Sequence, residues 1–315
     1  MMGMNGMRKF LRNLVQTLIL IVGITFLSFT LSYLSPGDPA QQMLKRSGMM
    51  VTEETLQKAR YELGLDQPML VQYGLWLRNL AKGDMGTSVK SRKAVALELG
   101  KRLPNTALLA LVSMLLVIAI STPVGLLCAW WKDGPLDNAF RFVTYLFASL
   151  PSFFISLIMM YVLALRLKWF PVIGSVSVKG IVMPALVLSL TLSAWYIRQV
   201  RAIVLREMEK GYIDGLMSRG LSTGSILFRH VLRNCMVPLV TLFGISIGNL
   251  MGGATIVESI FSWPGVGKLA VDSITARDYP MIQGYVVWMA LIFLAINFLV
   301  DLSYRFLDPR IRKGA

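Results

Sequence analysis

Six long windows of the chain contain no aspartate, glutamate, lysine or arginine. Each window is about as long as a helix that crosses a hydrocarbon core, at a rise of ~1.5 Å per residue. Because backbone groups find no water inside a membrane, spanning segments are helices or closed barrels, and unbroken apolar runs favour helices. The sequence therefore predicts an all-α integral membrane protein with six transmembrane helices, in Leu14–Leu34, Thr106–Trp131, Phe142–Leu165, Ile181–Ile197, Asn234–Val257 and Tyr279–Val300.

The composition favours the same class of protein. Hydrophobic residues make up 55% of the 315 residues, which is more apolar surface than a soluble globule of this length can bury. The net charge of +15 comes from basic residues dispersed around the window ends, so we expect membrane lipid headgroups, and no nucleic acid, as the counterpart. The first window is too long for a cleaved secretory signal and lacks a small-residue cleavage site, so we expect it to be retained.

Lysine and arginine near the window ends indicate the orientation. With a cytoplasmic N-terminus, the inner segments carry 16 of these residues and the two short outer loops carry five. The other 11 lie in the long loop before the second window, and loops of that length cross a membrane largely regardless of charge. The sequence therefore predicts that both termini are cytoplasmic. Cys128 and Cys235 then lie near cytoplasmic helix ends, where we expect free packing thiols.

The long loop before the second window has helix start and stop signals of its own. Thr52 can cap a helix that Gly64 ends, and Pro68 can open a second helix that Gly83 ends. The apolar faces of these amphipathic helices are Leu56, Ala59 and Leu63 in the first and Leu70, Tyr73, Trp76, Leu77 and Leu80 in the second. We expect a transmembrane helix with a large helical outer loop over residues 1–104, followed by a five-helix core over 105–315.

The energy source of any transport activity is restricted by what the sequence lacks. Carriers driven by protons or voltage usually place ionisable residues within the membrane, and all six windows lack them. The string GVGK at Gly265–Lys268 does not have the spacing of a phosphate loop, so any ATP and its Mg²⁺ would bind on another chain. His230 is the only histidine, and no Cys/His cluster or carboxylate pair lies at membrane depth, so we expect neither an enzyme nor a metal centre.

The basic stretch Arg219–Pro238 lies between the fourth and fifth windows and resembles the cytoplasmic coupling loop of ABC importer permeases. In the family pattern EAA-x3-G-x9-I-x-LP, Gly220 takes the glycine. The other positions are filled by Asp214, Gly215 and Leu216 for Glu-Ala-Ala, His230 and Leu232 for Ile and Leu, and Arg233 for proline. The dipeptide, oligopeptide and nickel subfamily departs in a similar way, and it is matched by Tyr212, Ile213, Arg219, Gly220, His230, Leu232, Arg233, Asn234 and Pro238.

The chain is similar to this subfamily along nearly its whole length. The similar strings are GDPA, GLDQP, VQYGLWL and GDMGTS in the outer loop, RLPNT before the second window, FSWPGVG and RDYPMIQG after the fifth, and LDPRIR at the C-terminus. The resemblance implies a MetI-like, type I ABC importer permease core, whose coupling loop 201–237 docks on an ATP-binding subunit. The implied ATPase-coupling residues are Tyr212, Ile213, Asp214, Gly215, Leu216, Met217, Ser218, Arg219, Gly220, Leu221 and Ser222.

The glycine at position 220 suits a sharp turn between two short helices, which we expect at Tyr212–Arg219 and Ser222–Arg229. Candidates for the translocation pathway are polar or proline residues within the windows: Ser149, Pro151, Ser152, Ser246 and Asn249. Pro151 and Pro184 should kink the third and fourth windows, either as architecture or as a gate. The glycines of the fifth window, Gly244, Gly248 and Gly252, form a small-residue stripe that allows close helix packing.

An outer lip is expected around the fifth and sixth windows, formed by Trp263, Pro264, Gly265, Asp278 and Tyr279. A Pro-Gly turn beside an aromatic residue is typical of an anchor at the membrane interface. The resemblance implies a different role, contact with a cargo-loaded binding protein. The sequence leaves both interpretations open.

The resemblance implies the permease subunit of an ATP-driven importer in a bacterial cytoplasmic membrane, working by alternating access. The implied partners are a second homologous permease subunit, two ATP-binding subunits or domains, and an extracytoplasmic solute-binding protein that delivers the cargo. That cargo would be a dipeptide, an oligopeptide or nickel, the metal in chelated form. Two rival interpretations are a secondary transporter, which the lack of intramembrane charges disfavours, and a membrane sensor or assembly factor that transports nothing.

Overall fold

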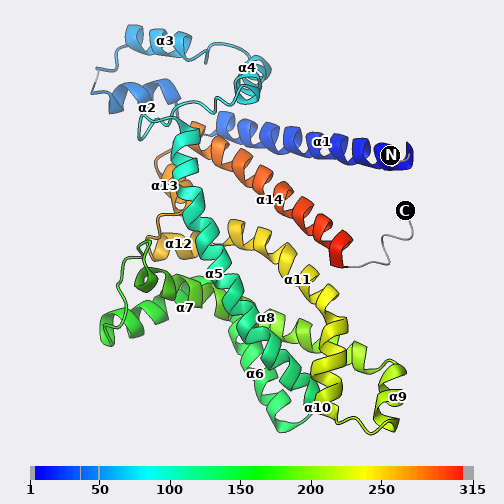
Figure 1. Ribbon diagram of the computed structural model, residues 1–315. Coiled ribbons are helices and arrows are strands. Elements are labelled where there is room, and N and C mark those ends of the chain that lie inside the picture. Colours follow the sequence, from blue (N-terminus) through cyan, green and yellow to red (C-terminus); the bar gives the residue numbers. More distant parts are fainter. Residues whose placement is uncertain (1–3, 36, 49, 308–315) are drawn as a thin grey trace. The chain divides into compact units, whose positions relative to one another are not determined.

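A computed structural model describes residues 4–35, 37–48 and 50–307, whose regular elements are helices joined by loops (Figure 1). An isolated bridge between Thr87 and Ala94 is the one strand-like pairing in that part of the chain. Five of the described helices are long and apolar enough to cross a membrane, and a bent pair makes six if it forms one crossing. The chain is a multi-pass, all-α membrane protein, which confirms the fold class predicted from the sequence.

The described residues form two compact units. Of the described residues, the first unit comprises those up to Pro104 and Leu269–Leu294, and the second comprises Asn105–Lys268 and those from Ala295 to Leu307. Three helices contribute residues to both units: α5 (Val95–Trp130), α13 (Val266–Thr275) and α14 (Tyr279–Leu307).

In the first unit, the long helix α1 (Met4–Leu34) packs against the amphipathic helix α4 (Met69–Ala81). Tyr73 of α4 lies edge-on to Phe26 and Phe29, with ring centroids 5.3 and 5.5 Å apart. Its hydroxyl also donates to the carbonyl of Val22, 3.3 Å away. Aromatic pairs of this kind add ~0.5–1.5 kcal/mol beyond the area they bury. The expected helix after Pro68 is confirmed, although Leu70 at its start is 69% exposed and lies off the packed face.

The other helix predicted in this loop is α3 (Glu53–Glu62), capped by Thr52 and followed by Gly64 at φ +64°. Its partner α2 (Pro39–Arg46) was not expected, because eight residues are too few for a clear apolar period. Buried Ala40, Leu44 and Ala59, with the half-buried Leu56 and Leu65, form the small core between them. Leu63, which the sequence placed on the apolar face, caps the helix and is 47% exposed.

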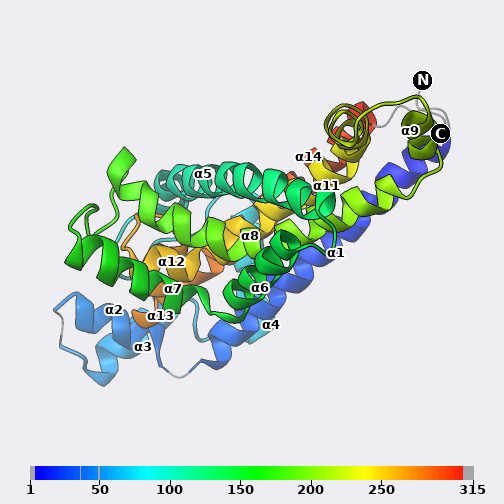
Figure 2. The same ribbon diagram turned by 90° about the horizontal axis from the view of Figure 1, so that it is seen from below.

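Helix α8 (Val178–Met208) is the central element of the second unit (Figures 1 and 2). It packs against α6 (Pro135–Ser149), α7 (Ser152–Met159) and α11 (Leu232–Gly253). Its apolar window is 61% buried, the highest fraction among the five candidate spans in the described residues. The helix runs continuously through Pro184 and continues past Ile197, so it is longer than the apolar window that predicted it. The smaller elements of this unit are η1 (Met160–Arg166), α9 (Tyr212–Ser218), α10 (Thr223–Ser225), η2 (Ile226–Val231) and α12 (Thr255–Ile260).

The third window predicted from the sequence is broken into two limbs at Pro151, where a kink was expected. Helix α6 and the segment Ser152–Arg166 differ in direction by 99°. The break falls at Leu150 and Pro151, whose ψ angles of 128° and 143° are extended. Proline has no N–H for the helix ladder and forces the preceding residue out of the helical region, so the helix stops there.

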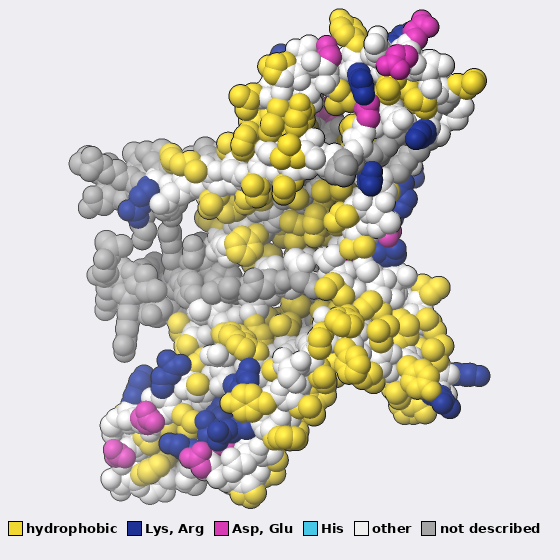
Figure 3. All heavy atoms as spheres, turned by 180° about the vertical axis from the view of Figure 1, so that it is seen from behind, with side chains coloured by type: hydrophobic (Ala, Val, Ile, Leu, Met, Phe, Trp, Pro, Cys, Tyr) yellow, Lys and Arg dark blue, Asp and Glu magenta, His cyan; other side chains and the backbone are white. Residues whose placement is uncertain are grey.

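Large apolar side chains are exposed over much of the described surface (Figure 3). Examples on three different helices are Leu27, Leu111 and Phe142. Exposed apolar area on this scale is not tolerated by a soluble monomer. It suits helices whose outer faces contact lipid.

Candidate functional site

The expected turn after the fourth window begins with the short helix α9. Gly220 follows it at φ +79°, and its N–H donates to the carbonyl of Met217 at 2.9 Å. A left-handed backbone is costly for residues with a Cβ, which explains the glycine. A Cβ at this position would meet no atom within 4 Å, so the glycine serves backbone conformation and not close packing. The segments α10 and η2 follow the turn and together cover Thr223–Val231, where the sequence predicts a second helix over Ser222–Arg229.

A buried carboxylate anchors the start of α9. Glu207, in the last turn of α8, accepts hydrogen bonds from the Tyr212 hydroxyl and the Asn234 amide, each 3.1 Å from Oε1. The same amide donates to the Tyr212 hydroxyl oxygen at 3.2 Å, and the Lys210 ammonium donates to Glu207 Oε2 at 2.6 Å. Glu207 is 8% exposed, and these donors offset the cost of removing its charge from water. The ends of α8, α9 and α11 therefore meet at one group, which we call the Glu207 anchor.

Tyr212 is held as a donor at this anchor. Burial, together with the neighbouring Glu207 carboxylate, raises the pKa of the Tyr212 hydroxyl above its ordinary value. The hydroxyl therefore stays protonated throughout the physiological pH range and keeps its bond to Glu207.

Helix α9 has one fully buried side chain and an exposed outer face. Ile213 is buried, whereas Leu216 and Leu221 are half-buried. The remaining coupling candidates are exposed: Asp214, Gly215, Met217, Ser218, Arg219, Gly220 and Ser222. A short helix that is fixed at its base and exposed on its outer face can enter a groove on another chain.

The chain after the turn is packed against the C-terminal end of α5. A Cβ at Gly224 would lie 2.8 Å from Cη2 of Trp130, so the glycine allows the indole to approach the backbone. Phe228 lies edge-on to the same indole, with ring centroids 5.9 Å apart. Of the matched residues further along, Asn234 reaches the Glu207 anchor, and Pro238 lies inside α11.

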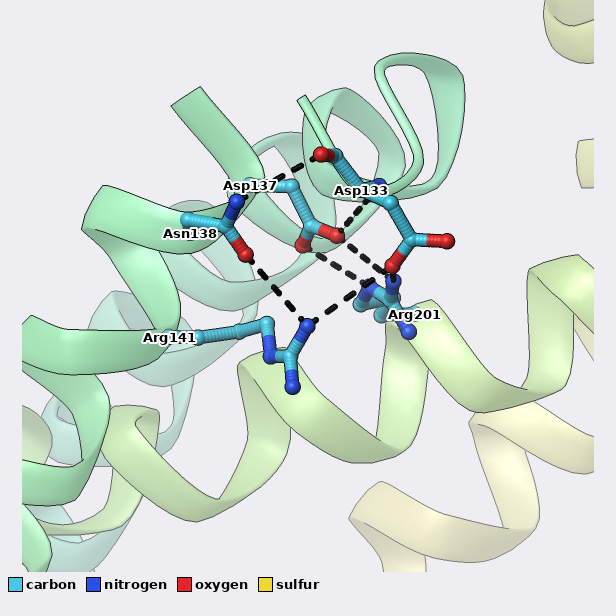
Figure 4. A network of polar contacts seen from close by, with 5 residues as sticks. All are labelled: Asp133, Asp137, Asn138, Arg141 and Arg201. Carbon is cyan, nitrogen blue, oxygen red and sulfur yellow. Dashed lines mark hydrogen bonds and ion pairs between the residues drawn. The ribbon is translucent and has the colours of Figure 1, made fainter. Parts of the chain in front are cut away.

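A second buried ion pair connects α6 to α8 (Figure 4). Arg201 of α8 donates through Nε to Oδ1 of Asp137 at 2.8 Å and through Nη2 to Oδ2 at 2.6 Å. The backbone N–H of Asp133 donates to Asp137 Oδ2 at 3.0 Å. Asp137 is fully buried, and a two-pronged guanidinium–carboxylate pair is among the strongest polar contacts in proteins. This pair fixes the first turn of α6 to α8.

Sequence reasoning missed Glu207, Asp137 and Arg201. One signal for Glu207 was available: the buried residues Ile197, Val200 and Val204 continue at helical spacing, and Glu207 occupies the next position of that stripe. A carboxylate on an apolar stripe requires partners. No sequence pattern identifies those partners, because Asn234 is separated from Glu207 by a whole helix–turn–helix segment.

The pathway candidates lie in different surroundings. The Ser149 hydroxyl donates to the Leu146 carbonyl. Ser149 and Pro151 are exposed at the bend, whereas Ser152 is half-buried. Ser246 differs from the expectation of a residue facing an open pathway. It is buried, and its hydroxyl donates to the Leu242 carbonyl at 2.8 Å, so a bond within its own helix satisfies it. The side chain of Asn249 lies outside the described residues.

The outer-lip candidates of the second unit are mostly interior. Trp263 is fully buried, and its indole N–H donates to the Asn105 carbonyl at 3.1 Å. It is therefore neither exposed at a membrane interface nor available to a partner, in contrast to both interpretations from the sequence. The physical reason is Glu258 of α12, whose buried carboxylate accepts from the Thr106 hydroxyl at 2.6 Å and the Lys268 N–H at 3.0 Å. Gly265 packs directly on that carboxylate, whereas Pro264 is half-buried.

Asp278 and Tyr279 belong to the first unit. The buried Asp278 carboxylate accepts from the Ser88 hydroxyl and from the backbone N–H groups of Val89 and Lys90, both at 3.1 Å. The Tyr279 hydroxyl donates to Ser35 Oγ at 3.0 Å. These two residues thus tie the long outer loop to the start of α14.

This chain is similar to known proteins both in sequence and in fold. The family model described as binding-protein-dependent transport system inner membrane component matches residues 121–313, and the model of its N-terminal part matches residues 7–110. The solved methionine ABC transporter MetNI, in an inward-facing form, has a chain of similar fold, with a TM-score of 0.59 and 19% identity over 67% of this chain and 97% of that one. That likeness shows the fold alone.

Curated relatives cover nearly the whole chain. The oligopeptide transport system permease protein AppB of Bacillus subtilis is 35% identical over 96% of this chain and 98% of its own length. The dipeptide transport system permease protein DppB of Alkalihalophilus pseudofirmus is 31% identical over the same shares. The glutathione transport system permease protein GsiC of Salmonella choleraesuis is 32% identical over 98% of this chain and 99% of its own. This chain therefore belongs to the inner-membrane components of binding-protein-dependent transport systems, the permeases of ABC importers.

Proposed function

We propose that this permease carries peptides into a bacterial cell as one subunit of an ATP-driven importer. The support for the cargo class comes from the relatives, which are named as permeases for dipeptides, oligopeptides and glutathione. All three cargoes are short chains of amino acids, so a peptide is favoured over chelated nickel.

The observation that carries the role of the subunit is the geometry of α9. The helix exposes Asp214, Met217 and Ser218, while its first residue is held by the buried Glu207 anchor. A force applied to the exposed face is therefore passed to α8 and α11 instead of bending a loose loop. We infer that this face docks on an ATP-binding chain, which holds the ATP and Mg²⁺, and that Tyr212–Ser222 are the coupling residues.

The proposed orientation follows the lysine and arginine distribution, with both termini in the cytoplasm. It places α9 on the cytoplasmic side, with the ATP-binding chains, and the long outer loop on the side of the binding protein. Alternating access requires two conformations whose populations the partners shift. The stripe of Gly244, Gly248 and Gly252 supports close packing against a second permease subunit, and Ser149, Pro151, Ser152 and Asn249 stay proposed as pathway residues.

The test is reconstitution of this chain in proteoliposomes with its partner permease, ATP-binding chains and binding protein. We expect a labelled dipeptide to stimulate ATP hydrolysis and to accumulate only when ATP is present. Uptake driven by an ion gradient without ATP would indicate a secondary transporter, and neither uptake nor stimulation would indicate a sensor or assembly factor. Stimulation by a nickel chelate but not by peptides would reject the peptide assignment alone.

A further inference from the structure

The buried pair of Asp137 and Arg201 lies on the same helix, α8, as the Glu207 anchor, but the two groups share no residue. Arg201 and Glu207 are six positions apart on α8, which is about 9 Å along a continuous helix. A helix of this kind behaves as a rigid element over such a distance. A displacement of α9 that moves Glu207 therefore also moves Arg201.

A movement of Arg201 would in turn act on α6, because the ion pair connects the two. Asp137 lies in its first turn, and the helix ends at the bend before Pro151. Beyond the bend, α7 packs against both α8 and α12. All of these elements belong to the second unit, so their packing forms a continuous series from α9 to α12.

We propose that Asp137 and Arg201 are positioning residues for transport, because they form the joint through which a displacement of α9 reaches α6. This inference rests on the proposed function, in which α9 receives the force from an ATP-binding chain.

The charged residues around the pair would allow α6 to shift along α8 while the Arg201 guanidinium stays paired with a carboxylate. Arg201 Nη2 lies 3.6 Å from Oδ1 of Asp133, a second carboxylate four residues before Asp137 (Figure 4). The side chain of Asp133 is 68% exposed, and Arg141 reaches the same oxygen at 3.7 Å. One guanidinium thus faces a buried and an exposed carboxylate, so α6 can slide along α8 while Arg201 keeps an ion pair. Sliding of one helix past another by up to a turn is a known form of conformational switching.

The test compares Arg201→Lys with Arg141→Lys in the reconstituted importer. Both changes keep the charge and remove the planar fork, but only Arg201 uses that fork on a buried carboxylate. We expect R201K to retain bound ATP-binding chains and peptide-stimulated hydrolysis, since α9 is intact. Peptide imported per ATP hydrolysed should fall about 5-fold or more, the scale of a lost coupling free energy. R141K should leave this ratio at the wild-type value.

Two outcomes for R201K would contradict this role. One is an unchanged ratio of peptide imported to ATP hydrolysed, and the other is an equal loss of import and hydrolysis, which would indicate a purely structural contact. If R201K does not assemble, the double variant D137L/R201M decides, because it leaves no buried charge unpaired. Assembly with hydrolysis but little import supports the joint, whereas assembly with a wild-type ratio, or no assembly, overturns it. A wild-type importer without peptide-stimulated hydrolysis refutes the proposed function instead, before any variant is measured.

Discussion

The Tyr212 hydroxyl lies 3.1 Å from Oε1 of Glu207, so the first residue of α9 is bonded to the last turn of α8. The bond makes the orientation of α9 a property of α8, which is the most buried of the candidate spans in the described residues.

Removing the Tyr212 hydroxyl should loosen this connection. In Tyr212→Phe, Glu207 loses one donor while remaining largely buried, which costs about 1.5–3 kcal/mol for a hydrogen bond to a charged group. We expect a lower midpoint of thermal unfolding for the second unit and reduced peptide-stimulated ATP hydrolysis. Tyr61→Phe is the matched control, because Tyr61 is 76% exposed on α3. Equal behaviour of the two variants would show that the bond contributes nothing.

Gly220 should be intolerant of a side chain for reasons of backbone conformation. Its φ of +79° makes Gly220→Ala unfavourable by about 1–2 kcal/mol, although a Cβ meets no neighbour. We expect α9 to change its angle and stimulated ATP turnover to fall, with membrane insertion unchanged. Gly100→Ala is the control, since that glycine lies inside α5, outside the coupling residues, and a Cβ there also meets nothing within 4 Å. Turnover in G220A equal to that in G100A would contradict the prediction.

Gly224 should be intolerant for reasons of space. An alanine Cβ would lie 2.8 Å from the Trp130 ring, so either the indole or the backbone of α10 has to move. Overpacking of this kind typically costs about 1–3 kcal/mol. The measurement is the thermal stability of purified protein in detergent, with Gly74→Ala as control, because a Cβ at Gly74 meets nothing within 4 Å. The idea fails if G224A melts at the wild-type temperature.

The proposed orientation can be tested with single cysteines. Cys128 and Cys235 are buried, so the unmodified protein should react poorly with an impermeant maleimide. A cysteine replacing exposed Asp66 should be labelled from outside intact cells, and one replacing exposed Arg219 only after the cells are opened. Labelling of the second position in intact cells would reverse the topology.

The sequence is sufficient to predict that the long apolar windows are helices, because lipid imposes a simple rule on them. A window without charges has few alternatives to a spanning helix. The caps at Thr52 and Gly64 depend only on residues that are close in sequence, so they could be predicted as well. The bend at Pro151 was also expected, since proline acts on its own neighbours. Its size, 99°, depends on the packing of α7 and could not be read from the proline.

The candidate site was predictable only in part, because it depends on contacts between distant residues. Tyr212 and Gly220 were found by pattern, whereas Glu207 was not, since its partners are brought to it by folding. Trp263 shows the opposite failure. An aromatic residue beside a Pro-Gly turn suggests an exposed anchor, but the segment folds over the buried Glu258 and encloses the indole.

The bend at Pro151 also affects the lipid around this chain. Helix α6 has 15 residues, and the other limb has eight in α7 and seven in η1. Each limb is therefore at most about 22 Å long, shorter than a hydrocarbon core of ~30 Å. Where neither limb reaches across, the bilayer has to thin locally or another subunit has to cover the gap. The conformation of the two limbs should therefore depend on the thickness of the surrounding membrane, and lipids with longer acyl chains should strain the bent pair.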